Sequence, residues 1–248
     1  MAAASAPTGP AISLEKMERT APGLVSLYKS AAVSLEKSGL SGQRAAVYLV
    51  LDRSGSMRRY YRDGTVQSLA ERVLGLSANL DDDGTVPVVV FSTDVDAQAP
   101  ISLDRHEGRI GDIVGSLGHM GRTNYHVAMD AVIDHYLGSG ATDPALVVFQ
   151  TDGGPSNRRA AEQYVCKAAS LPMFWQFIGF GDPHGHQFDF LRRLDELAVP
   201  ARRVVDNAGF FPAGRDPRRM RDTTLYDRLL GEFPQWLAAA RAQGIVPG

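Results

Sequence analysis

The sequence predicts an α/β fold in which a doubly wound, mostly parallel sheet is flanked by helices. Two apolar runs, at 45–51 and 86–91, and the mostly apolar segment 146–151 have the length and composition of strands that are buried on both faces. Segments with helical periodicity alternate with these runs, as parallel βαβ units require. The segment 95–103 is more alternating and contains Pro100, so we expect it to be an antiparallel edge strand.

The remaining elements follow from the same patterns, in chain order. We expect residues 1–44 to form an N-terminal arm with a short helix at 24–37, and residues 45–248 to form one domain. Apolar residues recur at i, i+3, i+4, i+7 and i+8 from Val66, which predicts a helix that ends near Leu80. Further helices are expected at 107–117, 125–137, 158–169 and 188–197, with strands at 173–179 and 202–206. The last segment, 225–240, has helical spacing interrupted by Pro234, which predicts two short helices or one with a break.

Composition and charge exclude several classes of protein. The 248 residues include 26 basic and 28 acidic side chains, and a net charge of −2 lacks the basic excess of a nucleic-acid binder. The apolar runs are far shorter than the roughly 20 residues of a membrane span. The N-terminus lacks the basic start and apolar stretch of a secretory signal, so we expect a cytoplasmic protein. A single cysteine, Cys166, excludes an intrachain disulfide and a cysteine-rich metal site.

Polar residues follow two of the predicted central strands. Asp52, Ser54 and Ser56 come after the run 45–51, and Asp152 comes after the run 146–151. Thr123 lies in a glycine-rich loop between them. Because ligands of open α/β sheets bind outside the carboxyl ends of the strands, we expect these five residues to meet at one edge.

Two carboxylates and three hydroxyls are hard oxygen donors, which suit Mg²⁺ or Mn²⁺; we expect Ca²⁺ less, and zinc and copper fit poorly. The set leaves a coordination position open, and an ion that keeps net positive character attracts an external carboxylate. The residues therefore predict a metal site that captures Asp or Glu from a protein partner.

The pattern Asp52-x-Ser54-x-Ser56, Thr123 and Asp152-Gly153 resembles the metal-ion-dependent adhesion site of von Willebrand factor A domains. The segments 33–37, 51–57, 121–125 and 205–211 are similar to the bacterial tellurium-resistance (TerF-like) branch of these domains. That branch is itself similar to the copines. The resemblance implies a cytoplasmic binding module in metal and stress responses, without established catalysis, and another tellurium-resistance protein as a candidate partner. Arg122 departs from the pattern, because glycine is common there; it would either perturb the loop or supply a cation beside the incoming acid.

Three alternatives remain beside this interpretation. The first is a metal-dependent hydrolase or phosphotransferase that uses the same sheet edge. A haloacid-dehalogenase phosphatase would need a second aspartate at the position of Ser54, and the sequence offers no obvious general base. Sequestration of a soft metalloid is disfavoured by the single cysteine. A zinc site at Asp182, His184 and His186 is disfavoured because no other cysteine or histidine is near in sequence. We therefore expect no catalytic residues.

Overall fold

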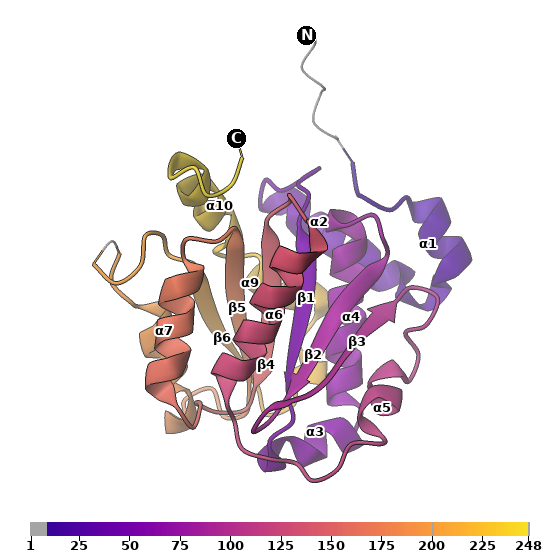
Figure 1. Ribbon diagram of the computed structural model, residues 1–248. Coiled ribbons are helices and arrows are strands. Elements are labelled where there is room, and N and C mark those ends of the chain that lie inside the picture. The colour runs from indigo at the N-terminus through magenta and orange to yellow at the C-terminus, as the bar shows by residue number, and fades with distance from the viewer. Residues whose placement is uncertain (1–8, 200, 248) are drawn as a thin grey trace.

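Six strands form one sheet in the order β3-β2-β1-β4-β5-β6 in the computed structural model, which describes residues 9–199 and 201–247 (Figure 1). Only the pair of β2 and β3 is antiparallel, so the predicted fold class and the edge position of β3 are confirmed. The strands are β1 (Ala46–Asp52), β2 (Thr85–Phe91), β3 (Val95–Ser102), β4 (Ala145–Thr151), β5 (Met173–Phe180) and β6 (Ala208–Gly214).

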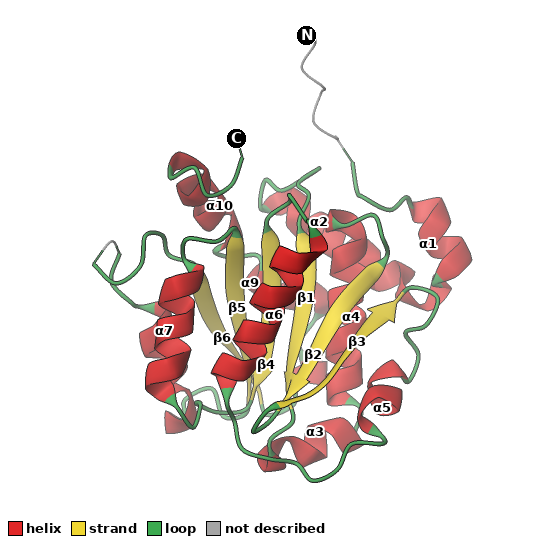
Figure 2. Cartoon of the chain, in the orientation of Figure 1, coloured by secondary structure: helices red, strands yellow, loops and turns green. Residues whose placement is uncertain are grey.

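Helices cover both faces of this sheet, which explains why every residue of β4 and β5 is buried (Figure 2). One core lies under α1 (Leu14–Thr20), α2 (Val25–Lys37), α3 (Arg58–Arg62), α4 (Thr65–Leu80), α5 (Arg109–Val114), α9 (Asp222–Leu229) and α10 (Phe233–Ala242). The other lies under α6 (Tyr125–Ser139), α7 (Arg158–Ala168) and α8 (Asp189–Asp195). Short 3₁₀ turns at Pro22–Leu24, Gly55–Met57, His186–Phe188 and Pro217–Arg219 complete the described elements.

The described part of the N-terminal segment packs on the sheet domain. Met17 and Tyr28 are buried in the larger core, and the Tyr28 hydroxyl donates a 2.7 Å hydrogen bond to the carbonyl of Ile12. Helices α2 and α4 approach so closely that a Cβ on Gly75 would lie 2.9 Å from the Cβ of Leu27. Sequence reasoning left open whether this segment packs or serves as a docking arm; from Gly9 onward it contributes to the core.

The strand predicted at 202–206 is wrong. That segment is a loop around the buried Arg203, whose guanidinium donates to the carbonyls of Asp195 at 2.7 Å and Leu197 at 3.2 Å. The strand is instead β6, which contains Gly209 and Pro212. Its edge position tolerates both residues, because an edge strand leaves one row of backbone groups unpaired.

The C-terminal segment was predicted to form two short helices or one with a break, and the structure has two helices. Helix α9 ends at Leu229, and Pro234 lies in the first turn of α10, where its missing N–H costs no helical hydrogen bond. By contrast, sequence reasoning missed the short helix α3 after the Asp-x-Ser-x-Ser phrase. No helix within 9–199 or 201–247 is long and apolar enough to cross a membrane.

Candidate functional site

The carboxyl ends of β1 and β4 carry the two candidate carboxylates. Asp52 is the last residue of β1, and Asp152 directly follows β4. The two strands are adjacent and parallel, with Leu51 opposite Gln150. The predicted convergence of these aspartates, 100 residues apart in sequence, at one sheet edge therefore follows from the topology.

Asp52 is fully buried and held by two hydrogen bonds. Its Oδ1 accepts from the Ser54 backbone N–H at 2.7 Å, and its Oδ2 accepts from the Thr151 hydroxyl at 2.7 Å. Burial, reinforced by the nearby Asp152 carboxylate and opposed by the Thr151 hydrogen bond, raises the pKa of Asp52 to about 7. The site thus holds a carboxylate that resists ionisation in its present surroundings.

The two serines connect this carboxylate to the second one. The hydroxyl oxygens of Ser54 and Ser56 lie 3.3 Å apart, and the Ser56 hydroxyl donates to Asp152 Oδ1 at 2.9 Å. Burial also raises the pKa of Asp152, although Ser56 acts in the opposite direction. Four of the five predicted donors therefore form one continuous polar cluster.

Thr123, the fifth predicted donor, lies in a loop that is fastened to this edge. The Gly121 carbonyl accepts from the Gly55 N–H at 3.3 Å, and the Thr123 carbonyl accepts from the Ser156 N–H at 2.7 Å. Gly121 packs so tightly that a Cβ there would lie 2.5 Å from Thr93 Oγ1. The loop is thereby fixed between the ends of β1, β2 and β4.

Arg53 also supports the site, and this role was not predicted from the sequence. The residue is 6% exposed, and its guanidinium pairs with Asp96 at 3.2 Å and donates to the carbonyls of Leu117, Gly118 and His119. This network ties the start of the Thr123 loop to the Asp-x-Ser-x-Ser segment. The available signal was alternation, since Arg53 must point away from its neighbours Asp52 and Ser54.

Thr151 and Tyr125 were missed as well. The Tyr125 hydroxyl donates to the Gly153 carbonyl and to Thr151 Oγ1, the latter at 3.2 Å. Thr151 in turn donates to Asp52, so a buried chain of hydroxyls orients this carboxylate. The sequence signal for this role was a hydroxyl residue at the end of β4, directly before Asp152.

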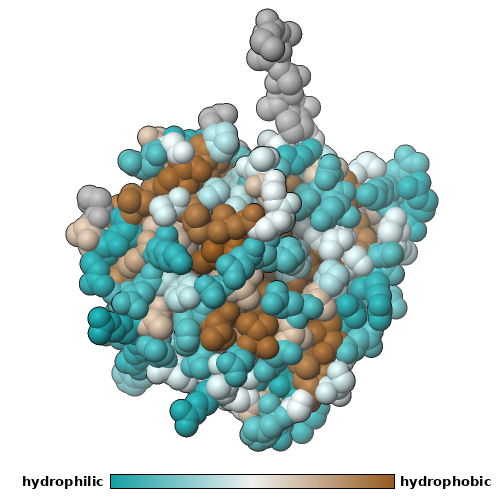
Figure 3. All heavy atoms as spheres, in the orientation of Figure 1, coloured by the Kyte–Doolittle hydropathy of each residue, from teal (hydrophilic) through white to brown (hydrophobic). Residues whose placement is uncertain are grey.

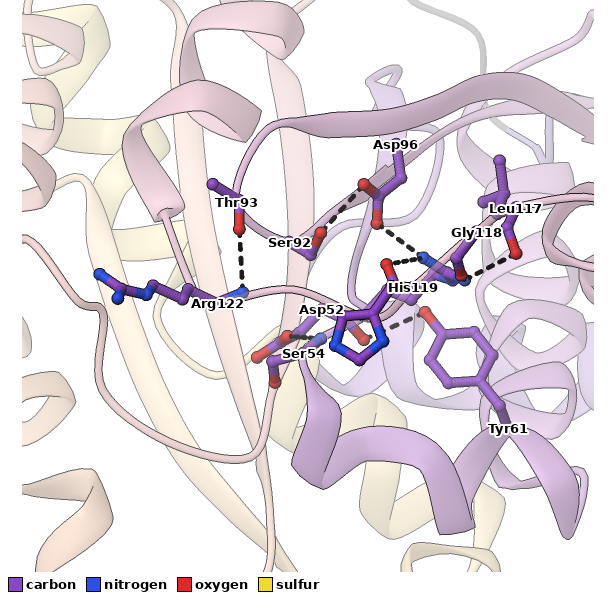
Figure 4. A network of polar contacts seen from close by, with 11 residues as sticks. Asp52, Ser54, Tyr61, Ser92, Thr93, Asp96, Leu117, Gly118, His119 and Arg122 are labelled. Atoms are coloured by element: carbon purple, nitrogen blue, oxygen red, sulfur yellow. Dashed lines mark hydrogen bonds and ion pairs between the residues drawn. The ribbon is translucent and has the colours of Figure 1, made fainter.

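Arg122 is held in the loop through its backbone. Its backbone N–H donates to Thr93 Oγ1 at 3.1 Å. Its side chain is exposed and extends away from Asp52 and Ser54 (Figure 4).

The loop that suggested zinc has ordinary surface contacts. Asp182 pairs with Arg215 at 2.6 Å, and His186 lies 3.0 Å from Asp189. Across the described residues, no three His, Cys, Asp or Glu side chains gather closely enough to hold a metal ion.

The donors at the strand ends fit a hard divalent cation on two grounds. All five side chains offer oxygen, and within the described chain neither Asp52 nor Asp152 belongs to an ion pair. A fully buried carboxylate without an ion-pair partner, such as that of Asp52, is costly unless a cation or protons neutralise it, and the partly buried Asp152 carboxylate nearby adds to this cost. Asp52, Ser54, Ser56, Thr123 and Asp152 are the residues that would hold such an ion.

Comparison with known proteins agrees with this fold. Residues 44–246 match the family model vWA-TerF-like, described as the vWA found in the TerF C terminus. The uncharacterized protein YcbR of Bacillus subtilis (strain 168) is 36% identical over 222 residues, 88% of each chain. A crystal structure of manganese-loaded TRAP protein from Plasmodium vivax aligns with 75% of this chain and 72% of its own, at 17% identity and a TM-score of 0.51, which supports the fold alone. The match across 44–246 and the similarity to YcbR establish that the chain belongs to the vWA-TerF-like family of von Willebrand factor A domains.

Proposed function

We propose that the protein binds a divalent cation, Mg²⁺ or Mn²⁺, through Asp52, Ser54, Ser56, Thr123 and Asp152. The bound ion then captures an Asp or Glu carboxylate from a protein partner. The TRAP protein of Plasmodium vivax, which has a similar fold, is manganese-loaded in its crystal structure, and this agrees with the proposed choice of ion.

The observation that carries the proposal is the fully buried Asp52. Its carboxylate accepts two hydrogen bonds but faces Asp152 instead of a positive side chain. A bound cation would favour the ionised form of both acids and neutralise their mutual repulsion. Two carboxylates formally balance a divalent ion, so the ion would keep positive character for an external acid if the three hydroxyls bind it directly and the carboxylates act partly through water.

The role we propose is binding without catalysis. The groups that hydrogen-bond to the two acids are hydroxyls and backbone amides, and the neighbouring Arg53 guanidinium is engaged with Asp96 and three carbonyls. Arg59 lowers the pKa of Asp152 but forms no ion pair with it among the described residues. A general base poised beside the edge is what the rival hydrolase or phosphotransferase would need. Membership of the TerF-like family supports a cytoplasmic role in tellurium or stress resistance, with another protein of that system as the partner.

Metal binding is tested by titration of the metal-free protein with Mg²⁺ and with Mn²⁺ in a calorimeter. We expect one site in the wild type and none in Asp152→Asn. Glu15→Gln, which removes an exposed carboxylate on α1, is the matched control and should bind like the wild type. Equal binding by all three proteins would remove the proposed site.

Partner capture is tested separately, by pull-down from the native host in Mg²⁺ and again in EDTA. We expect a protein that EDTA releases and that Asp152→Asn fails to retain. Partners indifferent to the chelator, together with turnover of a phosphoester by the metal-loaded protein, would favour the enzyme instead.

A further inference from the structure

A groove runs along the face of the sheet that α6 covers, beside the edge strand β3. Three depressions of about 500, 360 and 350 Å³ lie next to one another, because all three have His135 in their walls. Figures 1 and 2 show α6 in front of the sheet, with β2 and β3 uncovered beside it. We call this hollow the α6–β3 groove; its wall follows α6 from His126 to Ser139, a rise of about 20 Å.

The charged side chains that line the groove are acidic. No lysine or arginine lines the three depressions, and within the described chain none of the lining acids belongs to an ion pair; these acids are Asp81, Asp83, Asp94, Asp130, Asp134 and Asp143. Lys167 reaches the ring of Tyr164 at 5.8 Å, beside one end of the groove. In a chain with 26 basic and 28 acidic residues, this concentration of unpaired negative charge is local.

The floor of the groove is partly apolar. Pro87, Val89 and Pro100 line its middle section, and Val127 and Ala131 of α6 line one end. Figure 3, which views the molecule from this side, shows apolar patches bordered by hydrophilic surface. A ligand that fills the groove therefore needs apolar groups as well as positive charge.

The length of the groove and the spacing of its acids indicate which kind of cationic ligand would fit it. The acids are spread along the groove, and across the described residues they do not form a metal-binding group of three. A groove of this length fits about six extended residues. Lys or Arg side chains on such a segment would meet the acidic walls, and its apolar side chains would cover the floor.

We propose that the α6–β3 groove, which is lined by none of the five proposed metal donors, is a second docking surface for a basic protein segment that also carries apolar side chains. This inference goes beyond the proposed metal-dependent capture of an acid, since it requires the opposite charge on the partner and no metal ion.

The test is selection of a random library of 12-residue peptides on the wild-type protein in EDTA, followed by measurement of the affinities of recovered peptides. We expect sequences that combine Lys or Arg with apolar residues. The variants Asp130→Asn/Asp134→Asn and Asp83→Asn/Asp143→Asn address the two ends of the groove and keep each side chain's shape. We expect each to weaken binding by about fivefold or more, as two lost charge pairs imply.

The control Glu15→Gln/Glu18→Gln removes the same charge from exposed positions on α1 and should bind like the wild type. Thermal melting of every variant verifies that it is folded. The proposal is overturned if no basic peptides are enriched, or if the groove variants and the control bind them equally. Self-association of the wild type that the groove variants abolish would also overturn it, because the groove would then belong to a second copy. EDTA keeps this outcome independent of the metal site.

Discussion

Replacement of Asp52 by asparagine tests whether the buried carboxylate lacks a compensating charge in the metal-free protein. The substitution keeps the shape of the side chain and one carbonyl oxygen that can accept from the Ser54 N–H. The new amide can donate to Thr151 Oγ1, while the Thr151 hydroxyl donates to the Gly153 carbonyl, already 3.0 Å away. The main change is therefore the loss of an ionisable group.

The magnitude follows from the pKa of Asp52, which is raised from 3.8 to about 7 in the folded protein. Below pH 3.8 both states are protonated and the shift costs nothing. Between pH 3.8 and 7 the unfolded state loses its proton first, so folding stability falls as pH rises; above pH 7 the full cost remains. At 1.36 kcal/mol per pKa unit, the cost is about 4 kcal/mol at pH 8 and about 2 kcal/mol at pH 5.

We therefore expect the stability advantage of Asp52→Asn over the wild type in EDTA to grow by about 2–3 kcal/mol between pH 5 and pH 8. Urea unfolding at both pH values measures this difference, and effects that do not depend on pH cancel. Saturating Mg²⁺ at pH 8 should stabilise the wild type alone, by about 2.7 kcal/mol at 100 times the Kd. A difference that stays constant or shrinks as pH rises would refute the assignment of Asp52 as an uncompensated charge.

Three further substitutions address the support of the site. Arg53→Met should lower the free energy of unfolding by about 1–3 kcal/mol, since it leaves three carbonyls without this donor and the partly buried Asp96 with the Ser92 hydroxyl as its remaining donor; an unchanged urea midpoint would contradict this. Gly121→Ala should cost about 1–3 kcal/mol and weaken Mg²⁺ binding, because its Cβ would meet Thr93 Oγ1 at 2.5 Å; calorimetry with wild-type affinity would disprove the displacement of the loop. Thr151→Val should cost about 1.5–3 kcal/mol at pH 8 and less at pH 5, because the lost hydrogen bond favours ionised Asp52; an equal loss at both pH values would show that packing dominates.

Most of the fold could be predicted from local patterns of apolar and polar residues. The strands β1, β2, β4 and β5 were predictable because they are buried on both faces and therefore almost wholly apolar. Strand β6 was not predictable in this way. Its position at the sheet edge permits Gly209 and Pro212, and these residue types indicate a turn when the sequence is considered alone. The same limit applies to α3, a helix of only 5 residues.

The sequence by itself determined the fold class and the candidate oxygen donors, since strand ends and the spacing of Asp52, Ser54 and Ser56 are local properties. Only the tertiary structure decided what surrounds them. The pairing of Arg53 with Asp96, the hydroxyl chain from Tyr125 through Thr151, and the acidic α6–β3 groove all join residues far apart in the chain. Such contacts depend on which strands lie side by side. An ion pair or a hydrogen bond between distant segments produces no periodic pattern in the sequence, so it cannot be predicted from the sequence alone.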